Sequence, residues 1–178
     1  MNAPVGRERP QRLKRIGLYG LLLFLAGCAQ CGFFATLSFL PATPDLILGC
    51  LLAIALLDSP RVALVAALPA GFFLEAIGGS GLSLSPLVYC LILAVMSLWV
   101  EKLLPRFLSY AVLLAPAALL RAVCSVLERL AEGGLPTVGA LLLSCLWSIL
   151  CTAVLCLPLY GLTRLVRIPL VKKSKFSF

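Results

Sequence analysis

Long apolar runs, separated by short turns that carry proline, glycine or charge, fill most of the chain. A helix of about 20 apolar residues crosses the roughly 30 Å hydrocarbon core of a bilayer, and most of these runs approach that length. The pattern therefore predicts six membrane-spanning helices. They are expected at about Ile16–Leu37, Pro44–Leu57, Pro60–Ile77, Leu82–Val100, Pro105–Leu130 and Pro136–Tyr160.

Two of the turns carry signals for the start of a helix. In "TPD" we expect Thr43 as the N-cap, Pro44 at the first helical position and Asp45 in the first turn, and "SPR" repeats the pattern with Ser59 and Pro60. Proline is tolerated there because its missing N–H has no partner within the helix. The second predicted span is short, about 21 Å at 1.5 Å per residue, so a five-span alternative stays open.

The composition supports a membrane protein. Of the 178 residues, 62% are hydrophobic and 12% are charged, and the mean hydropathy is +1.10. Soluble domains are nearer half apolar and a quarter charged. We therefore expect an all-α polytopic transmembrane bundle, with one membrane-embedded domain at 16–163 between basic tails at 1–15 and 164–178.

The basic residues predict the orientation of the chain. In the six-span layout, thirteen of the fifteen lysines and arginines fall in the two tails or in the turns on the same side of the membrane. Basic loops stay in the cytoplasm, so both termini are expected there. The charge then describes loops that face anionic lipid, and no nucleic-acid partner is expected.

The chemistry-bearing residues do not suggest catalysis. The chain has no histidine, which is the commonest metal ligand and general base, and its eight cysteines lie within the apolar runs. No nucleophile is paired with a base at a recognisable spacing. We therefore expect no enzyme activity, no cofactor and no metal site.

Two charges lie deep within predicted spans. Glu75 and Arg121 each fall about 14 residues beyond the cytoplasmic end of a span, or roughly 21 Å, at the same depth. A charge at that depth is costly unless it is paired or hydrated. Three interpretations are open: a structural ion pair, a shared polar site for a ligand or partner, and an Arg121 side chain that extends outward to water. Asp45 at a helix start is explained by the helix dipole alone.

The stretch "PDLILGCLLAIALLDSPRVALVAALPAGFFLEAIGGSGLSLSPLVYCLILAVM" resembles the core of the MreD family of rod-shape-determining membrane proteins. The features that carry the resemblance are Pro44-Asp45-Leu46, Arg61, Gly71 with Glu75, Gly78-Gly79 and Leu87-Val88-Tyr89. The chain departs from the family where Glu75 replaces the usual aspartate. It departs again where Ser83 stands in place of a glycine, a role that Gly81 could fill through a shorter turn.

The resemblance implies a noncatalytic scaffold of the cell-elongation machinery. Its implied partners are an MreC-like bitopic protein, an MreB-like filament, a peptidoglycan polymerase and transpeptidase pair, and membrane lipid. Glu75 and its glycine turn would then shape a packed or partner-facing site. The candidate residues of this partner-interface or polar intramembrane site are Asp45, Gly71, Glu75, Gly78, Gly79, Gly81 and Arg121. The alternative is the substrate-binding S component of an energy-coupling-factor vitamin transporter, which would use a cavity lined by Glu75 and Arg121.

Overall fold

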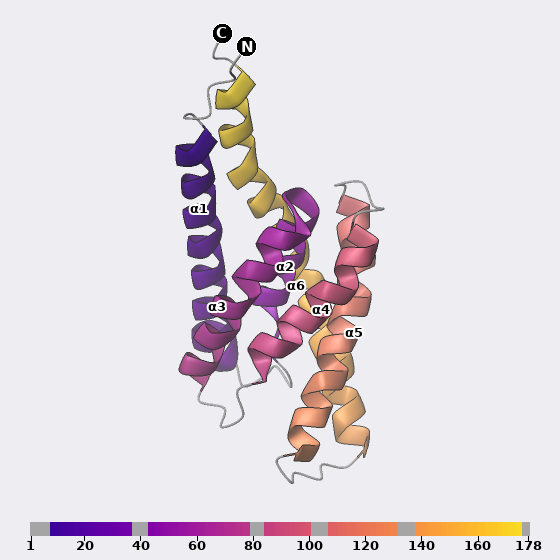
Figure 1. Ribbon diagram of the computed structural model, residues 1–178. Helices are drawn as coiled ribbons and strands as arrows, with labels where there is room; N and C mark the ends of the chain where they lie inside the picture. The colour runs from indigo at the N-terminus through magenta and orange to yellow at the C-terminus, as the bar shows by residue number, and fades with distance from the viewer. Residues whose placement is uncertain (1–7, 37–42, 79–83, 101–106, 132–137, 176–178) are drawn as a thin grey trace.

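The computed structural model describes residues 8–36, 43–78, 84–100, 107–131 and 138–175, and every element within them is helical (Figure 1). The helices are α1 (Glu8–Cys28), which continues as a π-helical segment (Ala29–Phe34), α2 (Leu46–Leu57), α3 (Pro60–Gly78), α4 (Ser85–Val100), α5 (Phe107–Ala131) and α6 (Val138–Lys175). The predicted all-α bundle is confirmed.

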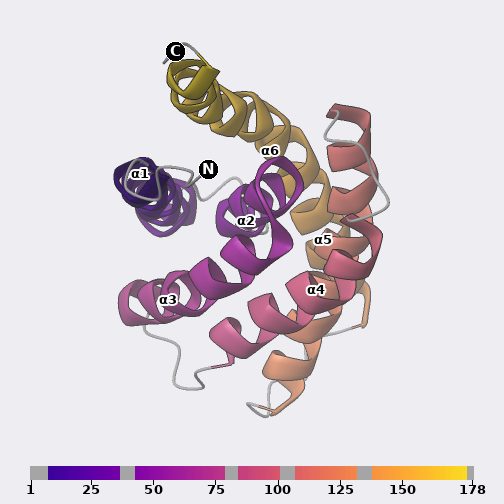
Figure 2. The same ribbon diagram turned by 45° about the horizontal axis from the view of Figure 1, so that its top comes forward.

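Helix α2 forms the centre of the bundle. All twelve of its residues are buried, and it contacts each of the other five helices. Figure 2 shows it enclosed by its neighbours. Its sequence "LILGCLLAIALL" has no polar face, and a helix that is apolar all round belongs in an interior. Because α2 is screened by protein, its length of about 18 Å does not have to match the bilayer.

The outer helices carry the surface suited to lipid. Within the described residues, four apolar helical stretches are long enough to cross a membrane: Lys14–Phe34, Pro60–Ile77, Phe107–Leu127 and Cys145–Leu165. Large apolar side chains are exposed on α1, α3, α4, α5 and α6, among them Val65 (73% exposed) and Leu108 (74% exposed). In water such a surface would be an aggregation hazard, whereas in a bilayer it is the expected exterior. The chain is a membrane-embedded helical bundle.

The two ends of the helical path lie on the same side of the bundle. The first turn of α1 and the last turns of α6 are together at one end in Figure 1. An even number of crossings requires this arrangement, so the six-helix layout replaces the five-span alternative. That this side faces the cytoplasm remains a prediction from charge.

Three predicted boundaries change. Helix α2 begins at Leu46 with Asp45 as its N-cap, so Thr43 as the cap was wrong. The reason is that the Asp45 carboxylate accepts a hydrogen bond from the Leu48 N–H at 3.0 Å, as an N-cap side chain does. Helix α1 already begins at Glu8, within the predicted N-terminal tail, and α6 continues past the predicted end at Tyr160.

Other boundary predictions hold. Helix α3 starts at Pro60, and the Ser59 hydroxyl accepts a hydrogen bond from the Val62 N–H at 3.3 Å. The helix ends at Gly78, one residue past the predicted end at Ile77. Gly79 and Gly81, which were expected to form the turn after it, lie outside the described residues.

A buried polar cluster as the candidate functional site

Asp45 is the centre of a polar cluster inside the bundle. Its side chain caps α2, and both of its carboxylate oxygens lie 3.0 Å from the Tyr89 hydroxyl of α4, which donates to them. The residue is buried, with 7% of its surface exposed. A carboxylate at this position is stabilised by the N-terminal end of the helix dipole and by charge-assisted hydrogen bonds.

Arg121 of α5 provides the opposite charge. Its Nε atom lies 3.3 Å from Oδ2 of Asp45, and its guanidinium carbon lies 5.6 Å from the centre of the Tyr89 ring. The Arg121 side chain is 18% exposed and the Asp45 side chain is 10% exposed, so the ion pair is largely buried within the bundle. A paired charge avoids most of the cost of a lone charge within a membrane.

Of the three interpretations of Glu75 and Arg121, the structure contains a buried ion pair, but the carboxylate that pairs with Arg121 is Asp45, and Glu75 contacts Ser85. The predicted depth of Arg121 still explains the contact. Asp45 is the N-cap of the short central helix α2, and its side chain is buried within the bundle. The sequence analysis placed Asp45 among the candidate site residues but did not predict Arg121 as its partner.

Two further side chains satisfy the backbone at the start of α2. The Gln30 side-chain oxygen accepts hydrogen bonds from the Leu46 N–H at 2.9 Å and from the Ile47 N–H at 3.3 Å. The Thr152 hydroxyl of α6 accepts from the Asp45 N–H at 3.0 Å. The first N–H groups of a helix have no partner within it, and leaving them unpaired in a membrane costs several kcal/mol.

Gln30 reaches α2 from the π-helical segment that follows α1. Such segments add a residue to a turn and are frequent where a side chain must be redirected. The cluster thus joins α2 to α4, α5, α6 and the continuation of α1. The sequence analysis did not name Gln30 or Thr152, and it named Tyr89 only as part of the resemblance motif. The signal that could have found all three is an isolated polar group in an apolar run.

Glu75 forms a second buried contact, between α3 and α4. Its Oε1 atom accepts a hydrogen bond from the Ser85 N–H at 2.7 Å, and so it provides a partner for a backbone N–H in the first turn of α4. The residue is 8% exposed, and its Oε2 atom has no hydrogen-bond partner among the described residues. Glu75 therefore links two helices through a backbone N–H.

Gly71 allows these helices to come together. A Cβ atom on Gly71 would lie 2.5 Å from the Cα atom and 2.7 Å from the backbone nitrogen of Pro86 in the first turn of α4. No ordinary side chain fits such a distance. Gly71 and Glu75 lie one helical turn apart, so the same face of α3 provides the close contact and the carboxylate that caps α4.

The arrangement suits structure more than reaction chemistry. Asp45 and Arg121 are engaged with each other and with Tyr89, and Glu75 is engaged with Ser85. No family model, curated protein or solved structure matches the chain. Its function is therefore inferred from its own residues.

Proposed function

We propose that the chain is a noncatalytic membrane scaffold of the bacterial cell-shape machinery, similar to MreD. The observation that carries the proposal is the use of the resemblance motif. Asp45, Gly71 and Glu75 each make an interhelical contact, and together they tie α2, α3 and α4 into one unit. A motif whose residues hold helices together inside the bundle fits a protein that presents a fixed outer surface to its partners.

The contacts of the buried charges favour a scaffold over a vitamin-binding S component. A binding site for a small solute needs several polar groups that converge on an open space. Here the carboxylate and guanidinium of Asp45 and Arg121 converge on each other. One cavity among the described residues lies between α1 and α3, and none of the buried charges lines it.

The expected partners follow from the surface. The exposed apolar faces of the outer helices suit helix–helix contact with a single-span, MreC-like protein and with the peptidoglycan polymerase and transpeptidase pair. The basic segments at the ends of the chain would face the cytoplasm, near an MreB-like filament and anionic lipid. The protein would act in the bacterial cytoplasmic membrane.

The experiment is an affinity purification from crosslinked bacterial membranes, with three variants at matched abundance. Wild type should recover an MreC-like protein and the wall synthases. Glu75→Gln, which keeps the oxygen that accepts from Ser85, should recover them equally, and Glu75→Ala should recover fewer. Recovery of transporter ATPases and their membrane coupling subunit instead would replace the scaffold proposal with the transporter one.

A further inference from the structure

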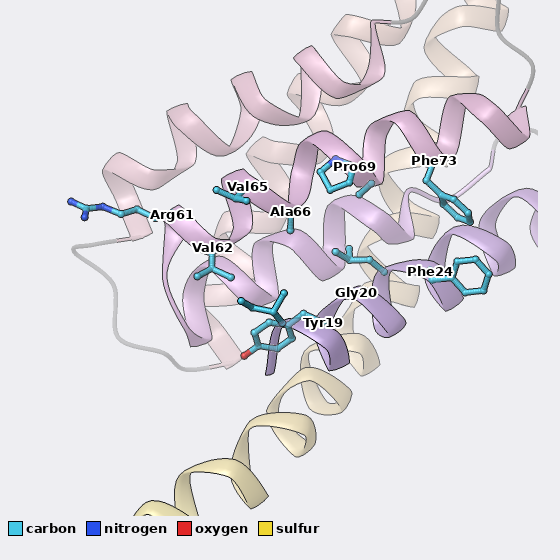
Figure 3. Close-up of a pocket in the computed structure, with 12 residues that line it drawn as sticks. Tyr19, Gly20, Phe24, Arg61, Val62, Val65, Ala66, Pro69 and Phe73 are labelled. Carbon is cyan, nitrogen blue, oxygen red and sulfur yellow. The ribbon is translucent and has the colours of Figure 1, made fainter. Parts of the chain in front are cut away.

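An apolar groove runs along the outside of the bundle between α1 and α3. Its volume is about 600 Å³, and Figure 3 shows the side chains around it. It is lined by Ile16, Tyr19, Gly20, Leu23 and Phe24 of α1 and by Arg61, Val62, Val65, Ala66, Pro69, Ala70 and Phe73 of α3. None of these residues belongs to the polar cluster around Asp45.

The two ends of the groove differ. At one end the rings of Phe24 and Phe73 are in contact, with their centres 5.1 Å apart. At the other end lies Arg61, in the first turn of α3, and its guanidinium extends away from the apolar lining in Figure 3. Between the ends, small residues such as Gly20 and Ala66 leave the space open. The groove is therefore an apolar channel with a single cationic end.

The surroundings of that end are basic. Arg61 and Lys14 are both exposed, and Arg15 forms an ion pair with Asp58 at 3.1 Å. The described side chains at this end of α1, α2 and α3 therefore have a net positive charge, because only one of the three basic residues is paired with a carboxylate. An anionic group is the complement of such a site, and each basic residue near a membrane surface contributes to its attraction.

The dimensions of the groove match a lipid chain. Arg61 and Phe73 are separated by about 18 Å along α3 at 1.5 Å per residue, which is close to half of the roughly 30 Å hydrocarbon core. The groove therefore runs from the headgroup level to near the middle of the bilayer. A molecule held there would occupy one leaflet.

The size of the groove suits a single small ligand or chain. Its volume of about 600 Å³ lies within the roughly 300–1,000 Å³ that is usual for small-molecule sites. A flexible hydrocarbon chain can fill it.

We propose that this groove binds an anionic phospholipid of the leaflet on the side where α1 begins. One acyl chain lies between α1 and α3 and ends against Phe24 and Phe73. The phosphate lies at Arg61. The site does not depend on the scaffold function, and its lipid would complete the surface of α1 and α3 that a partner or the bilayer meets.

The test is photocrosslinking in nanodiscs made of equal parts phosphatidylglycerol and phosphatidylcholine. The probe is a trace of either lipid with a photoreactive group in the acyl chain, and mass spectrometry maps the labelled peptides. The phosphatidylglycerol probe should label peptides of α1 and α3 in the wild-type protein. Ala66→Leu, which fills the groove, should abolish this labelling, and Arg61→Gln should lower the preference for phosphatidylglycerol by about fivefold.

Matched controls separate the groove from general effects. Ala115→Leu on α5 and Arg164→Gln on α6 make the same changes at exposed positions away from the groove. In both variants, α1 and α3 should be labelled to the same extent as in the wild-type protein. Unchanged elution on size exclusion would show that Ala66→Leu folds. Labelling of α1 and α3 that persists in Ala66→Leu would overturn the proposal. Equal labelling by both lipids, or crosslinking of the groove to a protein helix, would overturn it as well.

Discussion

The ion pair between Asp45 and Arg121 gives the sharpest prediction about stability. We consider three changes: Asp45→Asn, Arg121→Met, and the two together. Asparagine is chosen because it caps helices as well as aspartate and keeps an oxygen that can accept from Leu48 and Tyr89. Asp45→Asn therefore removes the charge while keeping the cap, and Arg121→Met removes the charge while keeping an apolar chain of similar length.

The expected size follows from the geometry. At the observed 3.3 Å between Nε and Oδ2, the attraction is about 5 kcal/mol for an effective dielectric constant of about 20, before desolvation is subtracted. Each single change leaves one buried charge without its partner, which costs about 3–5 kcal/mol. The Tyr89 hydroxyl stays with Asp45 and the Tyr89 ring stays with Arg121, so we expect the lower end, about 3 kcal/mol for each.

The double variant should be no less stable than either single one, because no unpaired charge remains. This corresponds to a coupling energy of about 3 kcal/mol. The assay is the apparent melting temperature in mild detergent, taken as the loss of monodisperse protein after heating. For a chain of this size each kcal/mol shifts the melting temperature by about 2–4 °C, so each single change should lower it by about 6–12 °C.

The exposed Arg164→Gln on α6 serves as a control for loss of a positive charge and should leave the melting temperature within about 2 °C of wild type. Additive losses in the double variant would refute the reasoning. They would mean that the two groups stabilise the bundle independently, whatever their distance.

The remaining predictions concern the joint between α3 and α4 and the orientation of the chain. Glu75→Gln should destabilise the bundle less than Glu75→Ala, by about 1 kcal/mol, because the amide oxygen can still accept from the Ser85 N–H. Equal losses of stability would show that the charge itself matters. Gly71→Ala should destabilise the bundle strongly because its Cβ atom would meet Pro86, whereas Gly17→Ala, with no atom within 4 Å, should be neutral or slightly stabilising. Similar results for the two glycines would contradict the close approach of α3 and α4. A cytoplasmic C-terminus is expected to make a fusion to green fluorescent protein fluorescent and a fusion to alkaline phosphatase inactive. The opposite pattern would reverse the proposed orientation.

Much of the fold could be predicted because one physical property determines it. Apolar runs long enough for a bilayer, with proline and glycine between them, specify helices and approximate ends. The end of α2 at Leu57 and the start of α3 at Pro60 are both as predicted. The sequence signal does not say which helix is central, because burial by protein and burial by lipid require the same apolar residues.

The candidate site was harder to predict for a related reason. Counting residues from a membrane surface gives the depth of a side chain but not its neighbours across the bundle. Glu75 and Arg121 were matched by depth alone, although Asp45 lies closer to Arg121. The Asp45 N–H is bonded to Thr152, 107 residues further along the chain, and no local pattern connects two such positions.

The structural role of Glu75 limits what a loss of binding can mean. Glu75→Ala removes the oxygen that accepts from the first N–H of α4, so the variant can lose partners simply because α3 and α4 separate. A partner contact at Glu75 is indicated only if Glu75→Gln also loses partners while its melting temperature stays near that of wild type. Loss in the alanine variant alone would instead place the partner on a surface that depends on the α3–α4 joint. The two substitutions must therefore be compared at equal stability before Glu75 is assigned to an interface.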